Sequence, residues 1–226
     1  MAIRAVVFDR DGVLTRFDFQ SLAAFFTPLL PFNLVKLGQR LRQWGEQVGF
    51  PKDAAAEKSF WQDFCNHLSD ELGLSISVRE QLLNFDYLNY MSPYPDAEMA
   101  LKYAHKYGLK VGVVSNNPMT GIYSSLQAMG LDQWVDAVCA AEVIGYAKPH
   151  PNAYLNVTDA LGVTPSECLY FDDEEICVEG ARALGMQAYM VVRPTDDSHG
   201  NSQDMQPGIS PELAVSDLTH LPGLLI

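Results

Sequence analysis

Residues 3–12 read Ile-Arg-Ala-Val-Val-Phe-Asp-Arg-Asp-Gly, and this stretch decides the fold that we predict for the chain. The apolar run that ends at Phe8 is typical of a central strand in a parallel sheet. Asp9 and Asp11 follow where the strand ends, and Gly12 permits a sharp backbone turn after them. Ligands of open α/β sheets bind beyond the carboxyl ends of the strands. Two acids at this place therefore favour a reactive site, with one as nucleophile or metal ligand and the other as proton shuttle, over a plain acidic turn.

The composition describes an acidic chain with ample material for a core. The 226 residues are 48% hydrophobic and include 28 acidic against 15 basic side chains, a formal net charge of −13. This length fits one large domain, or a core domain with a smaller inserted one. The charge argues against a nucleic-acid partner, because no cluster of Lys and Arg is present to collect phosphates. A small phosphorylated substrate remains compatible, since one lysine and one metal ion neutralise its charge locally.

Cysteine spacing and hydropathy indicate in which cellular compartment the protein is expected. The four cysteines show no CxxC spacing, so we expect buried thiols in a reducing environment rather than a zinc site. The N-terminus enters a strand at once, without a basic segment and a cleavable apolar stretch. No window approaches 18 uncharged apolar residues. We expect a cytoplasmic protein with no membrane partner, and we favour a monomer, although the sequence leaves the oligomeric state open.

The block at residues 16–92 predicts helices and no strand. Apolar side chains recur there at helical spacing. Asp53 is a candidate N-cap for a helix that Gly73 ends, and Ser77-Val78-Arg79-Glu80 resembles a capping box. The aromatic side chains of the block supply the core of a small helical bundle: Phe19, Phe25, Phe26, Phe32, Trp44, Phe60 and Trp61.

From Asp96, which we expect to cap a helix, helices and strands alternate. The predicted strands span residues 110–114, 135–139, 168–171 and 187–192, and the predicted helices span 96–107, 118–130, 151–161 and 174–184, with a helical turn near 218–225. This alternation predicts an α/β core with a parallel sheet and helices on both faces. We therefore divide the chain into a core at 1–15 and 93–226 and a helical insertion at 16–92. Residues 194–211 are rich in Asp, Ser, Gly, Asn and Pro and predict a mobile loop.

Further polar residues follow at the strand ends of this pattern. Ser115 and Asn116 follow the strand that begins near residue 110, Asp172 and Asp173 follow another, and Lys148 lies in a loop just before a helix. The carboxyl ends of parallel strands meet at one sheet edge, so we expect these side chains to converge there with the first two acids.

Together these groups suit phosphoryl transfer. A carboxylate attacks phosphorus only when the phosphoryl charge is neutralised, which Mg²⁺ achieves with oxygen ligands. A lysine supplies a second positive charge, and a serine hydroxyl with neighbouring backbone amides orients the phosphoryl oxygens. A second acid protonates the leaving alkoxide and then takes a proton from water.

Each residue type also has a structural interpretation. Ser115 fits a turn, Lys148 fits a solvated loop, and an acidic helix start is stabilised by the helix dipole. We assign only Glu174 and Glu175 to that last role. Arg10 lies between the two acids of the first segment, but strand alternation directs it away from them, so we expect a structural ion pair.

These four segments, in this order, resemble the motifs of the haloacid dehalogenase-like (HAD) hydrolase superfamily over essentially the whole chain. Asp9-Arg10-Asp11-Gly12-Val13 matches the first motif, Ser115 the second, Lys148 the third and Asp172-Asp173 the fourth. The helical insertion resembles the α-helical cap of subfamily I. The resemblance implies a Rossmann-like, doubly wound core that carries an inserted cap, with Phe17, Asp18 and Gln20 as candidates for the hinge and mouth of that cap.

The resemblance also implies catalytic and metal-binding roles. Asp9 would be the nucleophile and a ligand of Mg²⁺. Asp11 would be the general acid and base, and its backbone carbonyl would also bind the metal. Asp173 would be the distal metal ligand, with Asp172 beside it in support.

Phosphate binding would fall to Ser115, Asn116 and Lys148. Two positions depart from the pattern of the family. Cys177 stands where an Asn often follows the double aspartate, which puts the geometry of that loop in question. His150 stands where the family often has Asp, and we interpret it as a loop histidine without a catalytic role.

The function that we expect is a Mg²⁺-dependent phosphatase of small phosphorylated metabolites that works through an aspartyl-phosphate. A phosphomutase, a haloacid dehalogenase and a non-catalytic phosphate-binding relative remain open. Dehalogenation at carbon needs neither a metal nor an acid two residues after the nucleophile, so Asp11 disfavours it. A phospho-acceptor receiver domain would be roughly half this length and would lack the helical insertion.

Overall fold

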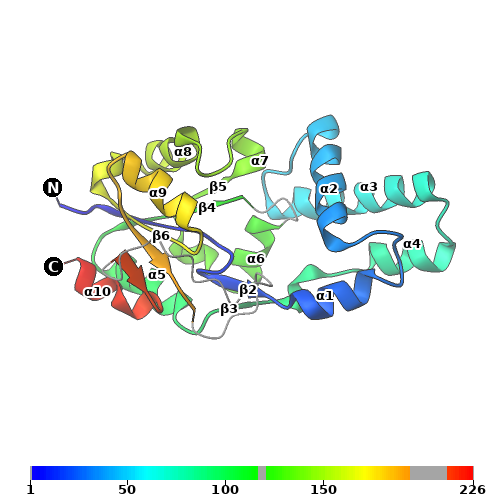
Figure 1. Cartoon of the computed structure of the whole chain (residues 1–226), viewed down its shortest axis with the longest axis horizontal. Coiled ribbons are helices and arrows are strands. Elements are labelled where there is room, and N and C mark those ends of the chain that lie inside the picture. Colours follow the sequence, from blue (N-terminus) through cyan, green and yellow to red (C-terminus); the bar gives the residue numbers. More distant parts are fainter. Residues whose placement is uncertain (1, 117–120, 194–212, 226) are drawn as a thin grey trace.

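The main sheet of the computed structural model, which describes residues 2–116, 121–193 and 213–225, has six parallel strands (Figure 1). Their order across the sheet is β5-β4-β1-β6-β7-β8, with the first strand of the chain in an interior position. The strands are β1 (Ala5–Phe8), β4 (Lys110–Ser115), β5 (Ala137–Ala140), β6 (Cys168–Asp172), β7 (Gln187–Val191) and β8 (Ala214–Val215). This sheet confirms the α/β prediction, and the two-residue strand β8 is the one member that the sequence did not indicate.

Helices cover both faces of the sheet, as the alternating pattern predicts. Val6 and Phe8 of β1 lie in one hydrophobic core and Ala5 and Val7 in another, because successive side chains of a strand point to opposite faces. The first core includes residues of α5 (Ala97–Lys106), α6 (Ile122–Ala128) and α10 (Leu221–Leu224); the second includes residues of α8 (Pro151–Leu161) and α9 (Glu175–Ala183). Figure 1 shows α8 and α9 above the sheet and α5 and α10 below it.

The four helices between β2 and β3 pack around a third core of their own. They are α1 (Phe19–Phe26), α2 (Leu34–Val48), α3 (Ala54–Leu72) and α4 (Ile76–Leu83). Buried members of this core include Leu22, Leu41, Phe64 and Leu82. The helices occupy one end of the long axis of the molecule, and the two chain termini lie at the other end (Figure 1).

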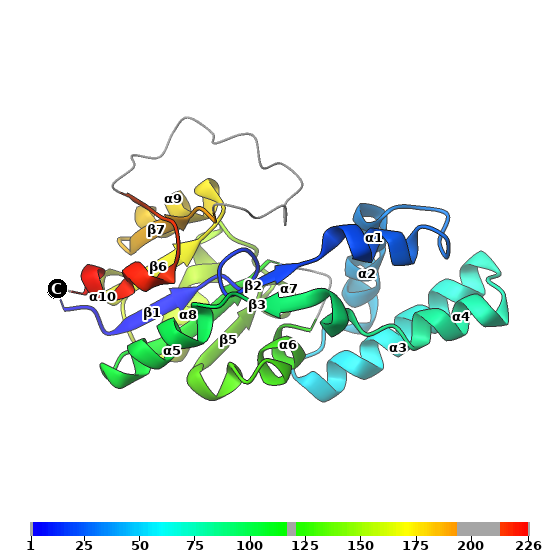
Figure 2. The same cartoon turned by 90° about the horizontal axis from the view of Figure 1, so that it is seen from below.

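The prediction that no strand forms within 16–92 is wrong at both ends of that block. β2 (Thr15–Phe17) and β3 (Met91–Pro93) form a two-stranded antiparallel sheet in which Arg16 pairs with Ser92. Each strand has three residues and its partner is far away in the sequence, so no turn signal or alternating run marks the pair. Figure 2 shows the two strands side by side, between the main sheet and α1.

Of the predicted N-caps Asp53, Ser77 and Asp96, the first and third are at the helix starts of the structure and the second is displaced. Asp53 caps α3 as expected, accepting a hydrogen bond from the backbone N–H of Ala56 at 2.8 Å. Gly73 ends that helix in the left-handed conformation, φ +61°. The capping box at Ser77 is wrong, because the N-cap of α4 is Ser75, two residues earlier.

Asp96 is the N-cap residue of α5 as predicted, but its carboxylate makes no capping hydrogen bond and is used elsewhere. Its Oδ2 accepts from Arg193 Nη1 at 2.7 Å and from the backbone N–H of Leu218 at 2.6 Å, and no N–H of α5 bonds to it. The ring of Tyr94 lies under the Arg193 guanidinium, 3.9 Å from its centroid. These contacts attach the C-terminal segment to the start of α5.

Shorter elements complete the described chain: α7 (Ala141–Ile144) and the 3₁₀ turns η1 (Tyr87–Tyr90), η2 (Asp132–Trp134), η3 (Pro165–Glu167) and η5 (Leu218–His220). The predicted loop at 194–211 and the start of the helix predicted from 118 lie outside the described residues. None of the helices described here has the length and apolar composition that crossing a bilayer requires.

Candidate active site

The sheet register brings three predicted site residues to one edge. Phe8 of β1 lies opposite Val113 of β4 and Phe171 of β6. Asp9 therefore leaves β1 level with the ends of its two neighbours, where Ser115 and Asp172 are the last strand residues. Its backbone N–H continues the ladder by donating to the carbonyl of Phe171 at 2.8 Å.

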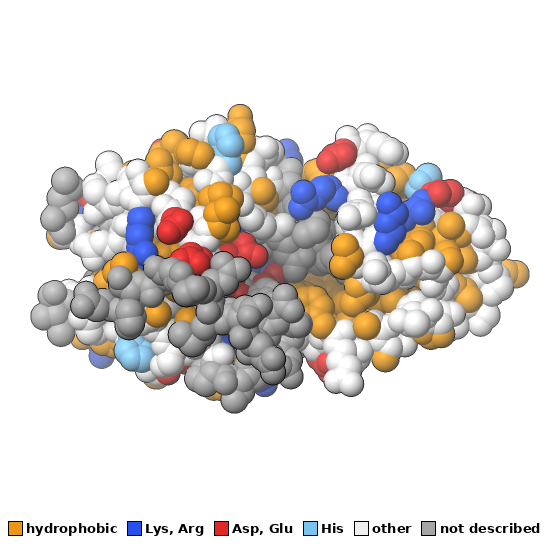
Figure 3. Space-filling model, viewed as in Figure 1, with side chains coloured by type: hydrophobic (Ala, Val, Ile, Leu, Met, Phe, Trp, Pro, Cys, Tyr) orange, Lys and Arg blue, Asp and Glu red, His pale blue; other side chains and the backbone are white. Residues whose placement is uncertain are grey.

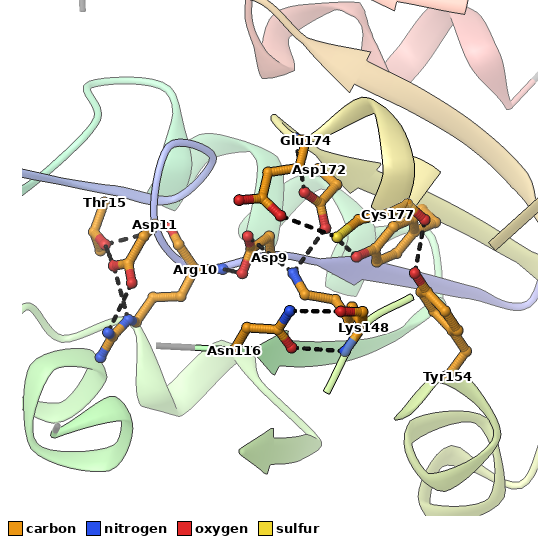
Figure 4. A network of polar contacts seen from close by, with 11 residues as sticks. Asp9, Arg10, Asp11, Thr15, Asn116, Lys148, Tyr154, Asp172, Glu174 and Cys177 are labelled. Carbon is orange, nitrogen blue, oxygen red and sulfur yellow. Dashed lines mark hydrogen bonds and ion pairs between the residues drawn. The ribbon is translucent and has the colours of Figure 1, made fainter. Parts of the chain in front are cut away.

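Lys148 reaches this edge from the loop before α8 (Figure 4). Its Nζ lies 2.9 Å from Asp9 Oδ2 and 2.7 Å from Asp172 Oδ2, and the side chain is almost fully buried. Burial alone would lower the pKa of Lys148, but Asp172 and Asp9 outweigh it and raise that pKa well above its ordinary value. The lysine is thus a permanent positive charge beside the predicted nucleophile.

Asn116 holds the backbone of the lysine loop. Its Oδ1 accepts from the N–H of Lys148 at 2.7 Å, and its Nδ2 donates to the carbonyl of the same residue at 2.9 Å (Figure 4). A phosphate contact from Asn116 would have to come from the second N–H of Nδ2 or from its backbone. Ser115, the neighbouring candidate, is buried at the end of β4 and lines the cavity described below.

Asp172 is fixed from several sides at the end of β6. It is fully buried, its Oδ1 accepts from the backbone N–H of Glu174 at 2.9 Å, and its Oδ2 accepts from the hydroxyl of Tyr170 and from Lys148. These bonds leave it little freedom to move toward a ligand. Asp173, the next residue, lines the cavity instead.

Carboxyl oxygens of Asp9, Asp172 and Asp173 lie within 4.8 Å of one another. Burial raises the pKa of Asp9 well above its ordinary value; Lys148 opposes this shift, and the three neighbouring acids add to it. The cluster thus carries more negative charge than one lysine balances. Its hard oxygen donors fit Mg²⁺.

A neighbouring group of Asp172, Glu174 and Cys177 does not fit that ion. The thiol of Cys177 donates to Glu174 Oε2 at 3.3 Å, and burial raises its pKa, which keeps it protonated and a poor ligand.

Gly12 explains how Asp173 comes so close to the first motif. The backbone of Gly12 has a φ of +76°, and an added Cβ would lie 2.0 Å from Asp173 Oδ2. A larger residue would therefore displace the predicted distal metal ligand.

Arg10 does not point away from both acids, so that part of the prediction is wrong. It forms a bidentate ion pair with Asp11, with Nε and Nη2 each donating at 2.9 Å, and it is fully buried. Strand alternation fails here because β1 ends at Phe8. Burial alone would lower the pKa of Arg10, but Asp11 outweighs it and raises that pKa.

The pair fixes the direction of the Asp11 side chain. Thr15 Oγ1 donates to Asp11 Oδ1 at 3.0 Å, and Arg10 Nη1 also donates to Ser125 Oγ at 3.2 Å. Figure 4 shows the Asp11 carboxyl group turned toward Thr15, on the side away from Lys148.

A cavity of about 900 Å³ opens between the sheet edge and the helices α1, α3 and α4. Its described lining includes Asp9, Asp11, Ser115, Lys148 and Asp173. Figure 3 shows acidic side chains near the middle of this face, with hydrophobic side chains bordering the same region on the side of the α1–α4 helices. The cavity thus places the reactive groups opposite an apolar wall.

The three residues predicted at the hinge and mouth of the cap, Phe17, Asp18 and Gln20, differ in their surroundings. Phe17 lines the cavity, and Asp18 caps α1 by accepting from the N–H of Ser21 at 2.9 Å. Gln20 is exposed and absent from the described cavity lining. His150 accepts from the N–H of Asn152 at 3.1 Å at the start of α8, in agreement with a structural histidine.

Glu57 is one of the described cavity residues that the sequence did not reveal. It lies on α3 and is buried, and its carboxylate accepts from the N–H groups of Tyr123 at 3.2 Å and Ser124 at 2.9 Å, and from the Ser124 hydroxyl. Tyr87 adds a second contact across the same boundary, donating to the carbonyl of Gly121 at 3.0 Å. One acid in a polar helix carries no sequence signal for such a role, because its partners lie more than 60 residues away.

Comparisons with known proteins find a phosphatase and a dehalogenase among the proteins similar to this chain. The chain is 40% identical over 206 residues to Phosphatase MT3486 of Mycobacterium tuberculosis (strain CDC 1551 / Oshkosh), a match that covers 91% of this chain and 94% of that protein. It is 30% identical over 200 residues to the (S)-2-haloacid dehalogenase of Xanthobacter autotrophicus, covering 87% and 78%.

Solved structures share the fold. The HAD phosphatase from Thermococcus onnurineus superposes with a TM-score of 0.62 at 24% identity, over 99% of this chain and 98% of that one. The L-2-haloacid dehalogenase from Xanthobacter autotrophicus gives 0.57 at 28% identity, over 99% and 98%. A family model described as haloacid dehalogenase-like hydrolase matches residues 3–185. The chain therefore belongs to the haloacid dehalogenase-like hydrolases.

Proposed function

We propose that this hydrolase is a Mg²⁺-dependent phosphatase that acts on small phosphorylated metabolites. The observation that carries the proposal is the juxtaposition of Asp9 with Lys148, 2.9 Å away, and with the carboxyl groups of Asp172 and Asp173. The 40% identity to a mycobacterial phosphatase supports the same class. The helices α1–α4 would act as a cap over the site.

The carboxylates Asp9 and Asp173 would hold the metal, with the backbone carbonyl of Asp11, as the family resemblance implies. Bound Mg²⁺ would neutralise the phosphoryl charge. Asp172 would support this set by orienting Lys148, to which it is ion-paired at 2.7 Å.

In the first step an oxygen of Asp9 attacks phosphorus and the bond between phosphorus and the ester oxygen breaks. Asp11 gives a proton to the departing alkoxide, so the alcohol leaves neutral. Lys148 and Ser115 hold the equatorial oxygens. The product of this step is an aspartyl-phosphate on Asp9.

In the second step water attacks the aspartyl-phosphate and Asp11 accepts its proton. The bond between phosphorus and the Asp9 oxygen breaks, inorganic phosphate leaves, and both acids return to their starting states.

A dehalogenase is the main alternative, because a relative that is 30% identical has that name. Substitution at carbon requires neither a metal nor a proton for a departing halide. The acidic cluster and Asp11 therefore favour phosphate esters. A phosphomutase would share the first step but would return the phosphoryl group to a second hydroxyl.

The test is phosphate release from p-nitrophenyl phosphate and a panel of phosphate esters, in Mg²⁺ and in EDTA. We expect release in Mg²⁺, its loss in EDTA, and a loss of roughly 10³-fold or more in Asp9→Asn, since a removed nucleophile has no substitute. Asp159→Asn, an exposed acid on α8, is the matched control and should keep full activity. Asp9→Asn retaining more than a few per cent of activity would refute the assignment. Halide release from (S)-2-chloropropionate without phosphatase activity would favour the dehalogenase.

A further inference from the structure

The cavity wall opposite the reactive groups is made mainly of apolar side chains. Phe17 and Phe19 come from the entry to α1, Trp61 comes from α3, and further apolar members come from the ends of α4 and η1. The apolar lining residues of this side are Phe17, Phe19, Leu22, Trp61, Leu83, Phe85 and Leu88. The indole N–H of Trp61 donates to the carbonyl of Leu82 at 3.1 Å, so that ring has its polar atom satisfied within the helical block. The wall thus offers mainly aromatic and aliphatic surface, with Lys58, Gln62, Asn84 and Tyr87 as its hydrogen-bond donors.

The charges of the lining would disfavour a leaving group with a second anionic charge. Among the described lining residues, Lys58 and Lys148 are the cations, against six acids. Lys148 is ion-paired with Asp9 and Asp172. Lys58 is exposed on α3, where solvent weakens its pull on an anion.

The sequence of the stretches outside the described residues contains no lysine or arginine. Residues 117–120 read Asn-Pro-Met-Thr, and residues 194–212 contain no Lys or Arg. Neither stretch has a lysine or arginine with which to bind a carboxylate or a second phosphate.

We propose that the leaving group of the substrate is uncharged and largely apolar, so that the enzyme prefers aryl or aralkyl phosphomonoesters over bisphosphates and phosphorylated carboxylic acids. This proposal rests on the phosphatase function proposed above. A cavity of about 900 Å³ holds an aromatic group in addition to the phosphoryl group. Burial of that group against the wall removes apolar surface from water, whereas a carboxylate there would lose hydration with only the solvent-exposed Lys58 as a cationic partner on that side.

The experiment compares two esters with alkyl leaving groups, 3-phenylpropyl phosphate and 3-carboxypropyl phosphate, with p-nitrophenyl phosphate as a general probe. The two leaving alcohols have similar basicity, so a difference in rate between the esters reports on binding of the leaving group. We expect kcat/KM to be at least about tenfold higher for the phenylpropyl ester, a difference that one apolar group against a pocket supplies. Equal rates, or a preference for the carboxylate, would overturn the proposal while leaving the phosphatase function intact. Absence of release from all three esters would overturn both.

Two variants locate the preference in the cavity. Phe19→Ser should lower kcat/KM for the phenylpropyl ester and leave the carboxypropyl ester unchanged, because Phe19 is 40% exposed and its removal does not open the core. Val35→Ser, an exposed apolar residue of α2 outside the lining, is its control. Gln62→Lys adds a cation to the lining and should raise kcat/KM for the carboxypropyl ester, whereas Gln43→Lys on α2 should not. If the cavity variants behave like their controls, the wall does not select the leaving group.

Discussion

Within the described part of the chain, Arg10 donates two hydrogen bonds and Thr15 one to the carboxyl group of Asp11. An acid that transfers protons needs a fixed position beside the leaving group, and these bonds fix the carboxyl group of Asp11 at the lining of the cavity. A bidentate pair with arginine is both strong and directional. The residue between the two reactive acids thus controls the position of one of them.

Arg10→Lys should lower kcat/KM by about tenfold or more, with a larger loss on alkyl phosphates than on p-nitrophenyl phosphate. A lysine keeps the positive charge but cannot form the planar double contact, so Asp11 is less well placed. Alkoxides need protonation more than nitrophenolate does, because they are more basic leaving groups. The measurement is kcat/KM on both esters, with thermal unfolding to confirm that the variant folds. An equal loss on both esters would show that Arg10 serves the fold alone.

For single residues, the sequence predicted the place of a side chain in the sheet better than it predicted the partners of that side chain. Strand ends of a parallel sheet share an edge, so Asp9, Ser115 and Asp172 could be placed together before the structure was known. The direction of Arg10 could not be predicted, because alternation holds only within a strand. The bond of Asn116 to Lys148 joins residues 32 positions apart, and only the folded chain brings them together.

At the scale of elements, the contact between α3 and the start of α6 joins the helical block to the sheet side of the cavity. Glu57 places a buried carboxylate against backbone N–H groups, where the positive end of the helix favours a negative charge. Loss of the Glu57 carboxylate would weaken the contact that holds α3 against the start of α6, on opposite sides of the cavity.

Glu57→Gln should therefore raise KM and lower kcat/KM by about tenfold, because the bonds to a charged acceptor contribute about 1–3 kcal/mol to the apposed state. Steady-state kinetics on p-nitrophenyl phosphate provides the measurement. Glu46→Gln, an exposed acid on α2, is the matched control. Unchanged kinetics in Glu57→Gln would show that this contact has no part in catalysis.

A second element-scale prediction concerns acid stability at the start of β6. Glu167 accepts from the backbone N–H of Thr164 at 2.8 Å, and Arg4 donates to it at 3.0 Å; these hydrogen bonds lower its pKa from 4.5 to about 2. A pKa that is lower in the folded than in the unfolded state stabilises the protein at pH values above the unfolded-state pKa. This stabilisation is lost as the pH falls from about 4.5 to about 2. Glu167→Gln should lower the free energy of unfolding at pH 7, and the gap to the native chain should narrow at pH 3. Urea unfolding at pH 7 and pH 3 measures the difference in unfolding free energy between the variant and the native chain. An equal difference at both pH values would contradict the lowered pKa of Glu167.

The helices and strands of the core were predictable because each has a strong local signal. Apolar runs and helix-stopping glycines mark the core elements within a few residues. The capping assignments were less successful. Ser77 has the right spacing for a capping box but Ser75 competes for the same helix start, and the carboxylate of Asp96, the N-cap residue of α5, binds a distant arginine.

At the scale of the whole molecule, the ion pair of Asp96 with Arg193 attaches the end of the chain to the core. Both side chains are almost completely buried, and the pair also involves the backbone of Leu218. Removal of one partner leaves the other charge buried without a counter-charge, which strongly destabilises the folded state.

Arg193→Met should destabilise the protein by roughly 3 kcal/mol, as measured by urea unfolding. Arg16→Met is the matched control, because Arg16 is exposed and lies over the same ring of Tyr94 at 5.8 Å. Its cost should stay below about 1 kcal/mol. Equal effects of the two substitutions would mean that the buried pair adds no stability of its own.

The paired strands β2 and β3 have a consequence for how this protein diversifies. Arg16 and Ser92 lie opposite each other, so the chain leaves the core and returns to it at neighbouring points. A segment whose two ends are fixed side by side is interchangeable: another module with adjacent termini could be spliced in at the ribbon without stretching the sheet. Evolution, or a protein engineer, has in this ribbon a junction at which the four-helix block can be exchanged while the half of the molecule that carries the main sheet stays the same.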